Sequence, residues 1–224
     1  MPYKIALICV FLPLISVHVT LTIALSVGNL ELCNPYWSEC HSISATGRQY
    51  PEFFVFKALL IPTAIFMMAY WLLLYNWVKR LANRSTKLII VTAMGIIASV
   101  ALIVYTVTLG AVGEPYALAR RIGVVFYFAF TSFGHLILLS CLDKIDTEKL
   151  GIVEQQNRLT ISCLVLIGTA IISAFLGLLW EEWWDKWENA YEWWFSLLMI
   201  SMFYQVASMW KRTNYQIRLH VEHN

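Results

Sequence analysis

Six long runs of apolar residues follow one another along the 224-residue chain. Each run has about the 20 residues that an α-helix needs to cross a hydrocarbon core of about 30 Å. The runs cover approximately residues 5–27, 53–78, 88–112, 122–142, 159–180 and 191–210. Only short links separate them, so residues 1–224 are predicted to form a single transmembrane domain. We therefore expect an all-α membrane protein, a six-transmembrane helix bundle.

The composition supports a chain that is embedded in a lipid bilayer. Apolar residues make up 59% of the sequence and charged residues only 13%, whereas soluble domains have about 45–50% and about 25%. A soluble fold of this size would lack the charges to cover its surface, so the apolar excess must face lipid. The net charge of +2 is small and argues against nucleic acid as a partner.

The basic residues predict the orientation of the bundle, because lysine and arginine accumulate on the cytosolic side. The first run is longer than the apolar core of about 7–15 residues in a signal peptide, so we expect it to be kept as a helix. With the N-terminus inside, the cytosolic side holds Lys4, Lys79, Arg80, Arg84, Lys87, Lys144, Lys149, Arg158, Lys211, Arg212 and Arg218. The other side holds Arg48, Lys57, Arg120, Arg121 and Lys186. Both termini are therefore predicted to be cytosolic, with the loop 28–52 outside or in an organelle lumen.

This outer loop contains the stretch CNPYWSECHSISATGRQYPE, residues 33–52. An oxidising compartment would let Cys33 and Cys40 pair, but a sequence does not supply the Cα separation that a disulfide requires. The pairing therefore stays open at this point. A metal site of Cys33, Cys40 and His41 matches no zinc-ligand spacing. We expect neither a metal ion nor another cofactor.

Two histidines lie within predicted spans, where an ionisable residue is costly and suggests function. Counted from the basic residues at the span ends, His18 and His135 differ in depth by about 12 Å, so they do not form one catalytic pair. Thr131 and Ser132 lie on the helical face of His135, and a bond to such hydroxyls would make it a structural connector. His18 lies nearer the outer loop and is the better functional candidate.

Glu192 opens the last run and shares the outer face with His41, Arg48 and Glu52. A carboxylate and an imidazole there could serve acyl transfer or lipid hydrolysis as general base and orienting partner, and Arg48 could hold a phosphate. These groups could equally be solvated charges beside an aromatic belt, since no GxSxG or HExxH motif is present. The segment WEEWWDKWENAYEWW, residues 180–194, is predicted to be such a belt around a short interfacial turn, or a platform for lipid headgroups.

Three stretches carry a family resemblance: SISATGRQYPE (42–52), FTSFGHLILLSCL (130–142) and NAYEWWFSLLMISMFYQVASMW (189–210). Together with six runs, they resemble the Frag/DRAM/Sfk-type six-transmembrane family, closest to the branch that contains post-GPI-attachment-to-proteins factor two. The pairs Gly134-His135 and Glu192-Trp193 carry the likeness to that branch. The loop GEPYALARR (113–121) lacks the His-Glu pair usual there, and Thr-Gly-Arg-x-x-Pro-Glu is closer to the autophagy branch, so the substrate stays open.

The resemblance implies a multi-pass protein of lipid metabolism in Golgi or ER membranes, with endolysosomal and plasma membranes as alternatives. The expected ligand is a membrane lipid or glycolipid such as a GPI anchor, and an enzymatic form would be acyltransferase-like remodelling. The alternative is a non-enzymatic scaffold or regulator of autophagy or lipid signalling. The candidate catalytic residues are His41, Glu192 and His18; the candidate substrate-binding residues are Arg48, Glu52 and Trp193; the structural residues are His135, Cys33 and Cys40.

Overall fold

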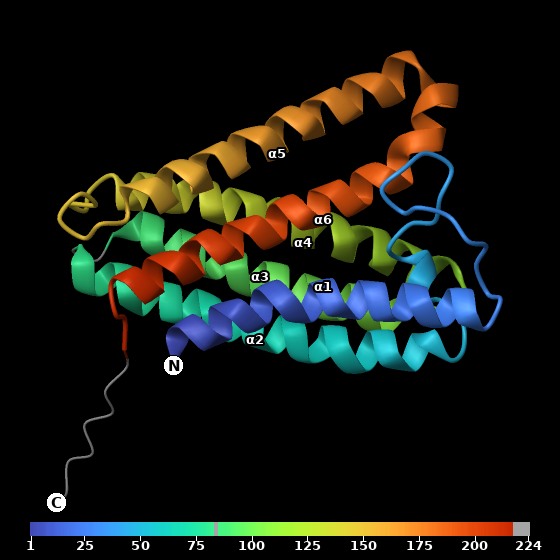
Figure 1. Ribbon diagram of the computed structural model, residues 1–224, viewed down its shortest axis with the longest axis horizontal. Helices are drawn as coiled ribbons and strands as arrows, with labels where there is room; N and C mark the ends of the chain where they lie inside the picture. Colours follow the sequence, from blue (N-terminus) through green and yellow to red (C-terminus); the bar gives the residue numbers. More distant parts are fainter. Residues whose placement is uncertain (83–84, 217–224) are drawn as a thin grey trace, which may run out of the picture.

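The computed structural model describes residues 1–82 and 85–216 of the chain, and this part contains six α-helices, a short 3₁₀ helix and no strand (Figure 1). The elements are α1 (Pro2–Ser26), η1 (Ala45–Gly47), α2 (Glu52–Leu81), α3 (Thr86–Thr108), α4 (Glu114–Leu142), α5 (Val153–Leu179) and α6 (Glu181–Arg212). The predicted all-α class is confirmed. Arg84 and Arg218, which entered the orientation argument, lie outside the described residues.

The helices α1 to α5 are long and apolar enough to cross a membrane by length and composition. Such helices define a multi-pass integral membrane protein embedded in a lipid bilayer. Helix α6 has 32 residues, but acids and tryptophans in its first turns lower its hydropathy. It begins at Glu181, directly after Trp180, which alone separates it from α5. The short turn predicted within residues 180–194 is therefore confined to Trp180, and the rest of that segment is the start of α6.

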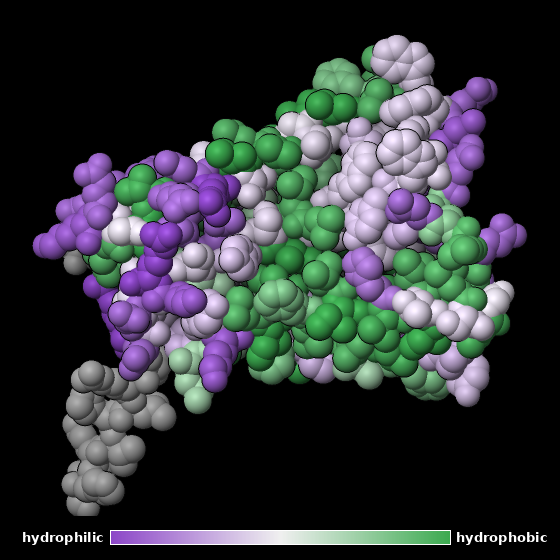
Figure 2. Space-filling view, viewed as in Figure 1, coloured by the Kyte–Doolittle hydropathy of each residue, from purple (hydrophilic) through white to green (hydrophobic). Residues whose placement is uncertain are grey.

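The helices alternate in direction, so α1 begins and α6 ends at the same end of the bundle (Figure 1). The basic residues at the ends of α2 and α6 lie there, and hydrophilic residues gather at this end in the space-filling view (Figure 2). A hydrophobic band follows toward the opposite end, which carries the loop 28–52 (Figures 1 and 2).

Small residues let the middle helices approach closely around one large side chain. Trp71 of α2 is 1% exposed and lies against Gly95 of α3, where an added Cβ would overlap the indole. A Cβ at Gly134 of α4 would come within 3.1 Å of the same ring. Glycine allows such packing in membrane helices, where association depends on close van der Waals contact.

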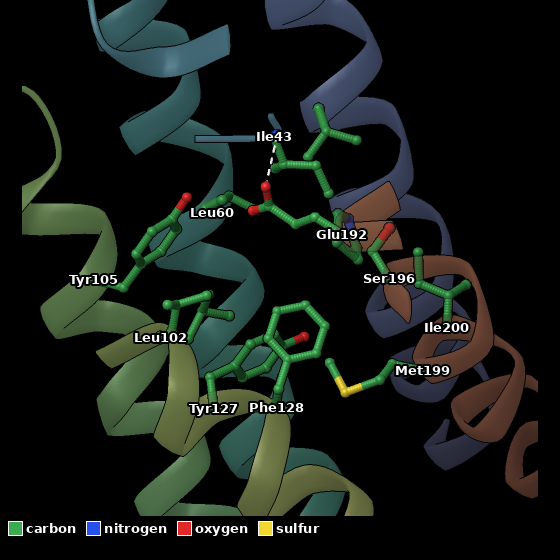
Figure 3. Close-up of a pocket in the computed structure, with 13 residues that line it drawn as sticks. Ile43, Leu60, Leu102, Tyr105, Tyr127, Phe128, Glu192, Ser196, Met199 and Ile200 are labelled. Atoms are coloured by element: carbon green, nitrogen blue, oxygen red, sulfur yellow. Dashed lines mark hydrogen bonds between the residues drawn. The ribbon is translucent and has the colours of Figure 1, made fainter. Parts of the chain in front are cut away.

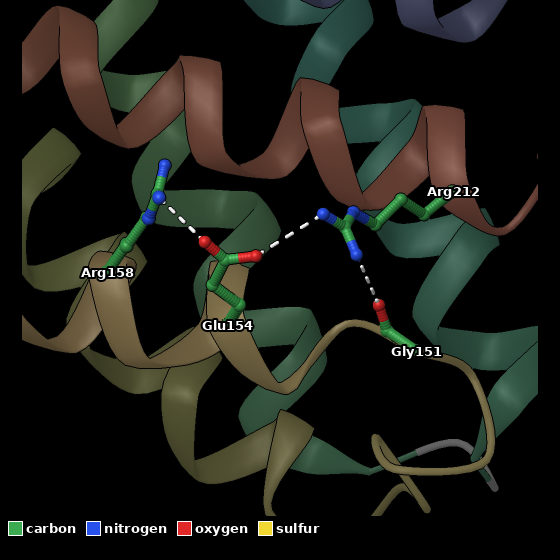
Figure 4. A network of polar contacts seen from close by, with 4 residues as sticks. All are labelled: Gly151, Glu154, Arg158 and Arg212. Carbon is green, nitrogen blue, oxygen red and sulfur yellow. Dashed lines mark hydrogen bonds and ion pairs between the residues drawn. The ribbon is translucent and has the colours of Figure 1, made fainter.

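Helix α5 packs along α6 and leaves the bundle at its outer end. Its buried residues are confined to its first half, and they are Gln155, Leu159, Cys163 and Leu166. Near its start, Glu154 pairs with Arg158 at 2.6 Å and with Arg212 of α6 at 3.3 Å (Figure 4). The second half of α5 diverges from α4 (Figure 1). This divergence leaves the outer halves of α4 and α6 open toward the bilayer.

Candidate functional site

The outer loop is folded and fastened to α6. Cys33 and Cys40 lie at disulfide distance, with their Cα atoms 5.6 Å apart, so the geometry permits the pairing that the sequence leaves open. The side-chain amide of Asn189 donates to the carbonyl of Cys40 at 2.8 Å, and the indole N–H of Trp193 donates to the carbonyl of His41 at 3.0 Å. We call residues 28–51 the outer cap.

Glu52 closes the other side of the outer cap. Its carboxylate is completely buried, and the amide of Asn29 donates to both of its oxygens at 3.0 Å. The same amide donates to the carbonyl of Tyr50 at 2.8 Å. Glu52 is also the first residue of α2, where the helix dipole favours a negative charge. The structure thus gives Glu52 a role in joining the two ends of the cap.

His18 joins α1 to the outer cap through Tyr36. Its Nδ1 lies 2.7 Å from the carbonyl of Leu14, and a carbonyl only accepts, so Nδ1 carries the proton. In the neutral imidazole, its Nε2 then accepts from the hydroxyl of Tyr36 at 2.9 Å. Burial raises the pKa of Tyr36, which keeps this hydroxyl protonated. The ring of Trp193 packs edgewise on both, with centroid distances of 5.4 Å to His18 and 5.6 Å to Tyr36.

His135 is a buried connector, but its partners differ from those expected. Its Nδ1 donates to the backbone carbonyl of Thr131 at 2.8 Å, and its Nε2 accepts from the hydroxyl of Tyr70 at 3.0 Å. The expected hydroxyl bonds are therefore wrong, and the hydroxyl of Ser132 instead donates to the carbonyl of Phe128 at 2.7 Å. The backbone carbonyl of Thr131 and the hydroxyl of Tyr70 thus occupy both ring nitrogens of His135.

The imidazole of His41 and the guanidinium of Arg48 both contact other residues of the cap. A ring nitrogen of His41 lies 3.1 Å from the carbonyl of Glu31. Arg48 is exposed and donates to the hydroxyl of Ser44 at 2.9 Å. Within the described ranges, neither side chain forms a hydrogen bond or ion pair with Glu192.

A cavity of about 60 Å³ lies beneath the cap. It is lined by Pro13, Val17, Ile43, Leu60, Leu102, Tyr105, Val124, Tyr127, Phe128, Glu192, Ser196, Met199 and Ile200. One carboxylate oxygen of Glu192 accepts from the backbone N–H of Ile43 at 3.2 Å, and the carboxylate lies between Ile43 and Tyr105 (Figure 3). The other oxygen is free to accept from a group inside the cavity.

Tyr105 supplies a second polar group to the same cavity. Its side chain is only 5% exposed, and its hydroxyl has no hydrogen-bond partner among the described residues. Buried polar groups are nearly always hydrogen-bonded, and this hydroxyl faces the cavity near Glu192 (Figure 3). The cavity therefore offers a carboxylate oxygen and an unpartnered hydroxyl to whatever enters it.

The cavity is small, and part of its wall is apolar and partly exposed. A pocket for a drug-sized ligand has about 300–1,000 Å³, so this one holds only a few groups of the size of water. Val124 and Phe128 of α4 and Ile200 of α6 line it and are half-exposed. Helix α4 packs mainly on α3 and only lightly on α6. The wall of the cavity on α4 and α6 is therefore apolar and partly exposed.

The predicted site residues therefore divide into two groups. One group lies where the cap joins α1 and α6, and it contains His18, Trp193 and the backbone of His41. Glu192, which precedes Trp193 in α6, lies beside this group at the cavity. Arg48 lies elsewhere on the cap, and Glu52 lies at the start of α2. Sequence reasoning does not single out Tyr36, Tyr105 or Asn189, because a tyrosine in an apolar run or an asparagine beside tryptophans has no distinctive pattern.

No protein family, curated protein or solved structure matches this chain. The fold and the apolar helices define its class, a multi-pass α-helical membrane protein. The resemblance to the Frag/DRAM/Sfk-type family stays a prediction from the three stretches quoted above.

Proposed function

We propose that this chain is a six-span protein of lipid metabolism that recognises a membrane lipid or glycolipid at its outer face, similar to the GPI-anchor lipid-remodelling factors of the Frag/DRAM/Sfk-type family. In this proposal α6 is the sixth span and both termini are cytosolic. The basic ends of α2 and α6 support that orientation. The pair Cys33–Cys40 also supports it, since disulfides persist on the lumenal or extracellular side. Golgi or ER membranes fit both observations.

The observation that carries the proposal is the position of Glu192. Its carboxylate is tied to the cap by the N–H of Ile43 and faces a cavity with otherwise mostly apolar walls. A carboxylate at this depth is costly, and such residues mark ligand sites or proton pathways in membrane proteins. A lipid fits this arrangement, because its chain can lie between α4 and α6 while its polar end reaches Glu192.

Lipid mass spectrometry on the purified protein tests the proposal. We expect wild type to retain one lipid class above its share in the surrounding membrane. Glu192→Gln should lose this enrichment, because the amide carries no charge for the polar end of the lipid. Glu188→Gln is the matched control, since Glu188 is exposed one turn earlier in α6. A lipid profile that equals the bulk membrane in wild type would overturn the proposal.

A non-enzymatic scaffold or regulator of autophagy or lipid signalling is the second candidate, and the position of His41 favours it. Acyltransferase-like remodelling through a His41–Glu192 pair requires the imidazole beside the carboxylate. The imidazole instead contacts the carbonyl of Glu31. The two functions share lipid recognition, and His41→Ala distinguishes them. A regulator keeps its activity in this variant, whereas an enzyme that uses His41 for proton transfer loses acyl exchange on anchored proteins and still binds lipid.

A further inference from the structure

We propose that the polar group held between Glu192 and Tyr105 is a protonated primary amine, so that the ligand is an amphipathic amine with a long apolar chain. This inference rests on the proposed lipid recognition and adds the chemical class of the ligand. Its basis is the combination of charge, hydrogen-bond acceptors and aromatic walls in one cavity.

The charged form of Glu192 would be stabilised by a cation in the cavity, because Arg48 acts on this carboxylate without forming an ion pair with it. The ion pairs in the described part of the chain involve Glu154 and Glu39, and Glu192 accepts only a backbone N–H. A carboxylate removed from water is strongly unfavourable unless it is paired or protonated. A cationic ligand would supply the opposite charge, whereas a neutral hydroxyl could donate to Glu192 and accept from Tyr105 but would supply no charge.

The acceptors around the cavity select an ammonium that carries N–H groups. A primary ammonium has three donors, and the free oxygen of Glu192 and the unpartnered hydroxyl of Tyr105 accept two of them. A trimethylammonium group has no N–H donor and is larger, so it would leave both acceptors unsatisfied in a cavity of about 60 Å³.

The walls of the cavity also favour a cation. Tyr105, Tyr127 and Phe128 line it together, and the faces of aromatic rings attract cations, most strongly when water is excluded. Tyr105 lies beside the carboxylate of Glu192, and Tyr127 and Phe128 lie below it in the view (Figure 3). The chain of the amine then leaves past the half-exposed Ile200 into the bilayer.

Three probes with the same sixteen-carbon chain separate these chemistries: hexadecylamine, hexadecanol and hexadecyltrimethylammonium. Each is titrated into the purified protein in nanodiscs, and retention is measured by native mass spectrometry beside thermal unfolding. We expect hexadecylamine to bind and raise the unfolding temperature, and the other two to bind at least about tenfold more weakly, because hydrogen bonds to a charged group contribute about 1.5–3 kcal/mol.

Variants locate the effect. Glu192→Gln should abolish the preference for the amine, Glu188→Gln should keep it, and Tyr105→Phe, which retains the ring, should weaken amine binding by about threefold to tenfold. Should Glu192→Gln fail to fold, Tyr105→Phe still tests the site. Equal binding of amine and alcohol would overturn the inference and leave lipid recognition standing. An unchanged amine preference in both cavity variants would also overturn it, and binding of no probe would count against the lipid site itself.

Discussion

The backbone N–H of Ile43 in the outer cap donates to the carboxylate of Glu192 in α6 at a distance of 3.2 Å. This bond joins the most polar segment of the outer face to the acid that faces the cavity. The shape of the cavity therefore depends on the docking of the cap. Predictions about the cap and predictions about the lipid site are linked for this reason.

The pair Cys33–Cys40 is expected to stabilise the docked cap. Closing a loop with a sequence separation of 7 removes denatured-state entropy, and its loss should lower the free energy of unfolding by about 2–3 kcal/mol. Thermal unfolding with and without reductant measures this effect. Cys33→Ser/Cys40→Ser should start at the lower stability and no longer respond to reductant. A wild type that is insensitive to reductant, with both thiols shown to be reduced, would contradict the prediction.

Asn29→Ala should destabilise the protein by about 1–3 kcal/mol, because it leaves the buried carboxylate of Glu52 without its amide donor. The double variant Asn29→Ala/Glu52→Gln should recover part of this loss, since the remaining group is neutral. Unfolding in detergent measures the three proteins. Glu31→Gln, an exposed acid on the same loop, should change little. Equal losses of stability in Asn29→Ala and in the double variant would show that Asn29 and Glu52 are not coupled.

Two glycine-to-alanine substitutions should change the free energy of unfolding in opposite directions. Gly95→Ala places a methyl group into the indole of Trp71 and should cost about 1–3 kcal/mol through overpacking. Gly168→Ala in α5 meets no atom within 4 Å and should stabilise by about 0.5–1 kcal/mol through helix propensity. Chemical unfolding of the two variants side by side measures the difference. A neutral Gly95→Ala would contradict the close packing of α2 and α3.

The bond from Tyr36 to His18 should be lost at high pH. Burial raises the pKa of Tyr36 above its ordinary value of 10.0, so the folded state holds this proton more tightly than the unfolded state. The stabilisation is then fully present below about pH 10 and is lost as pH rises through the folded pKa. The stability difference between wild type and Tyr36→Phe, followed from neutral to alkaline pH, measures it. A difference that already vanishes near pH 8 would contradict the bond.

Much of the fold could be predicted from the sequence, because apolar runs of membrane length determine where helices form. The six helices coincide with the six runs, and the start of α6 is the main exception. Its first turns mix Trp183 and Trp187 with acids, so hydropathy does not reveal a helix there, although the two indoles stack at 5.6 Å one turn apart. Apolar runs in the sequence identify membrane-spanning helices more readily than they identify an amphipathic helix at the membrane surface.

The candidate site could be predicted only in part. Charge and position place Glu192 and His41 on the same face. The bonds from Ile43 to Glu192 and from Trp193 to the carbonyl of His41 join segments about 150 positions apart, which no local pattern contains. The imidazole of His41 faces Glu31, and only its carbonyl reaches Trp193. Tyr105 enters the site through the packing of α3 against α4, and its hydroxyl is indistinguishable in sequence from that of any other tyrosine in a span.

The central claim is that a lipid occupies the space between α4 and α6 with its polar end at Glu192. An experimental density map of the protein with its co-purified lipid tests it most directly. The account predicts an elongated density along Phe128 and Ile200 that ends within hydrogen-bond distance of the carboxylate of Glu192 and the hydroxyl of Tyr105. Lipid density confined to the outer surface of α5, with the cavity beneath the cap closed or filled by side chains, would contradict it.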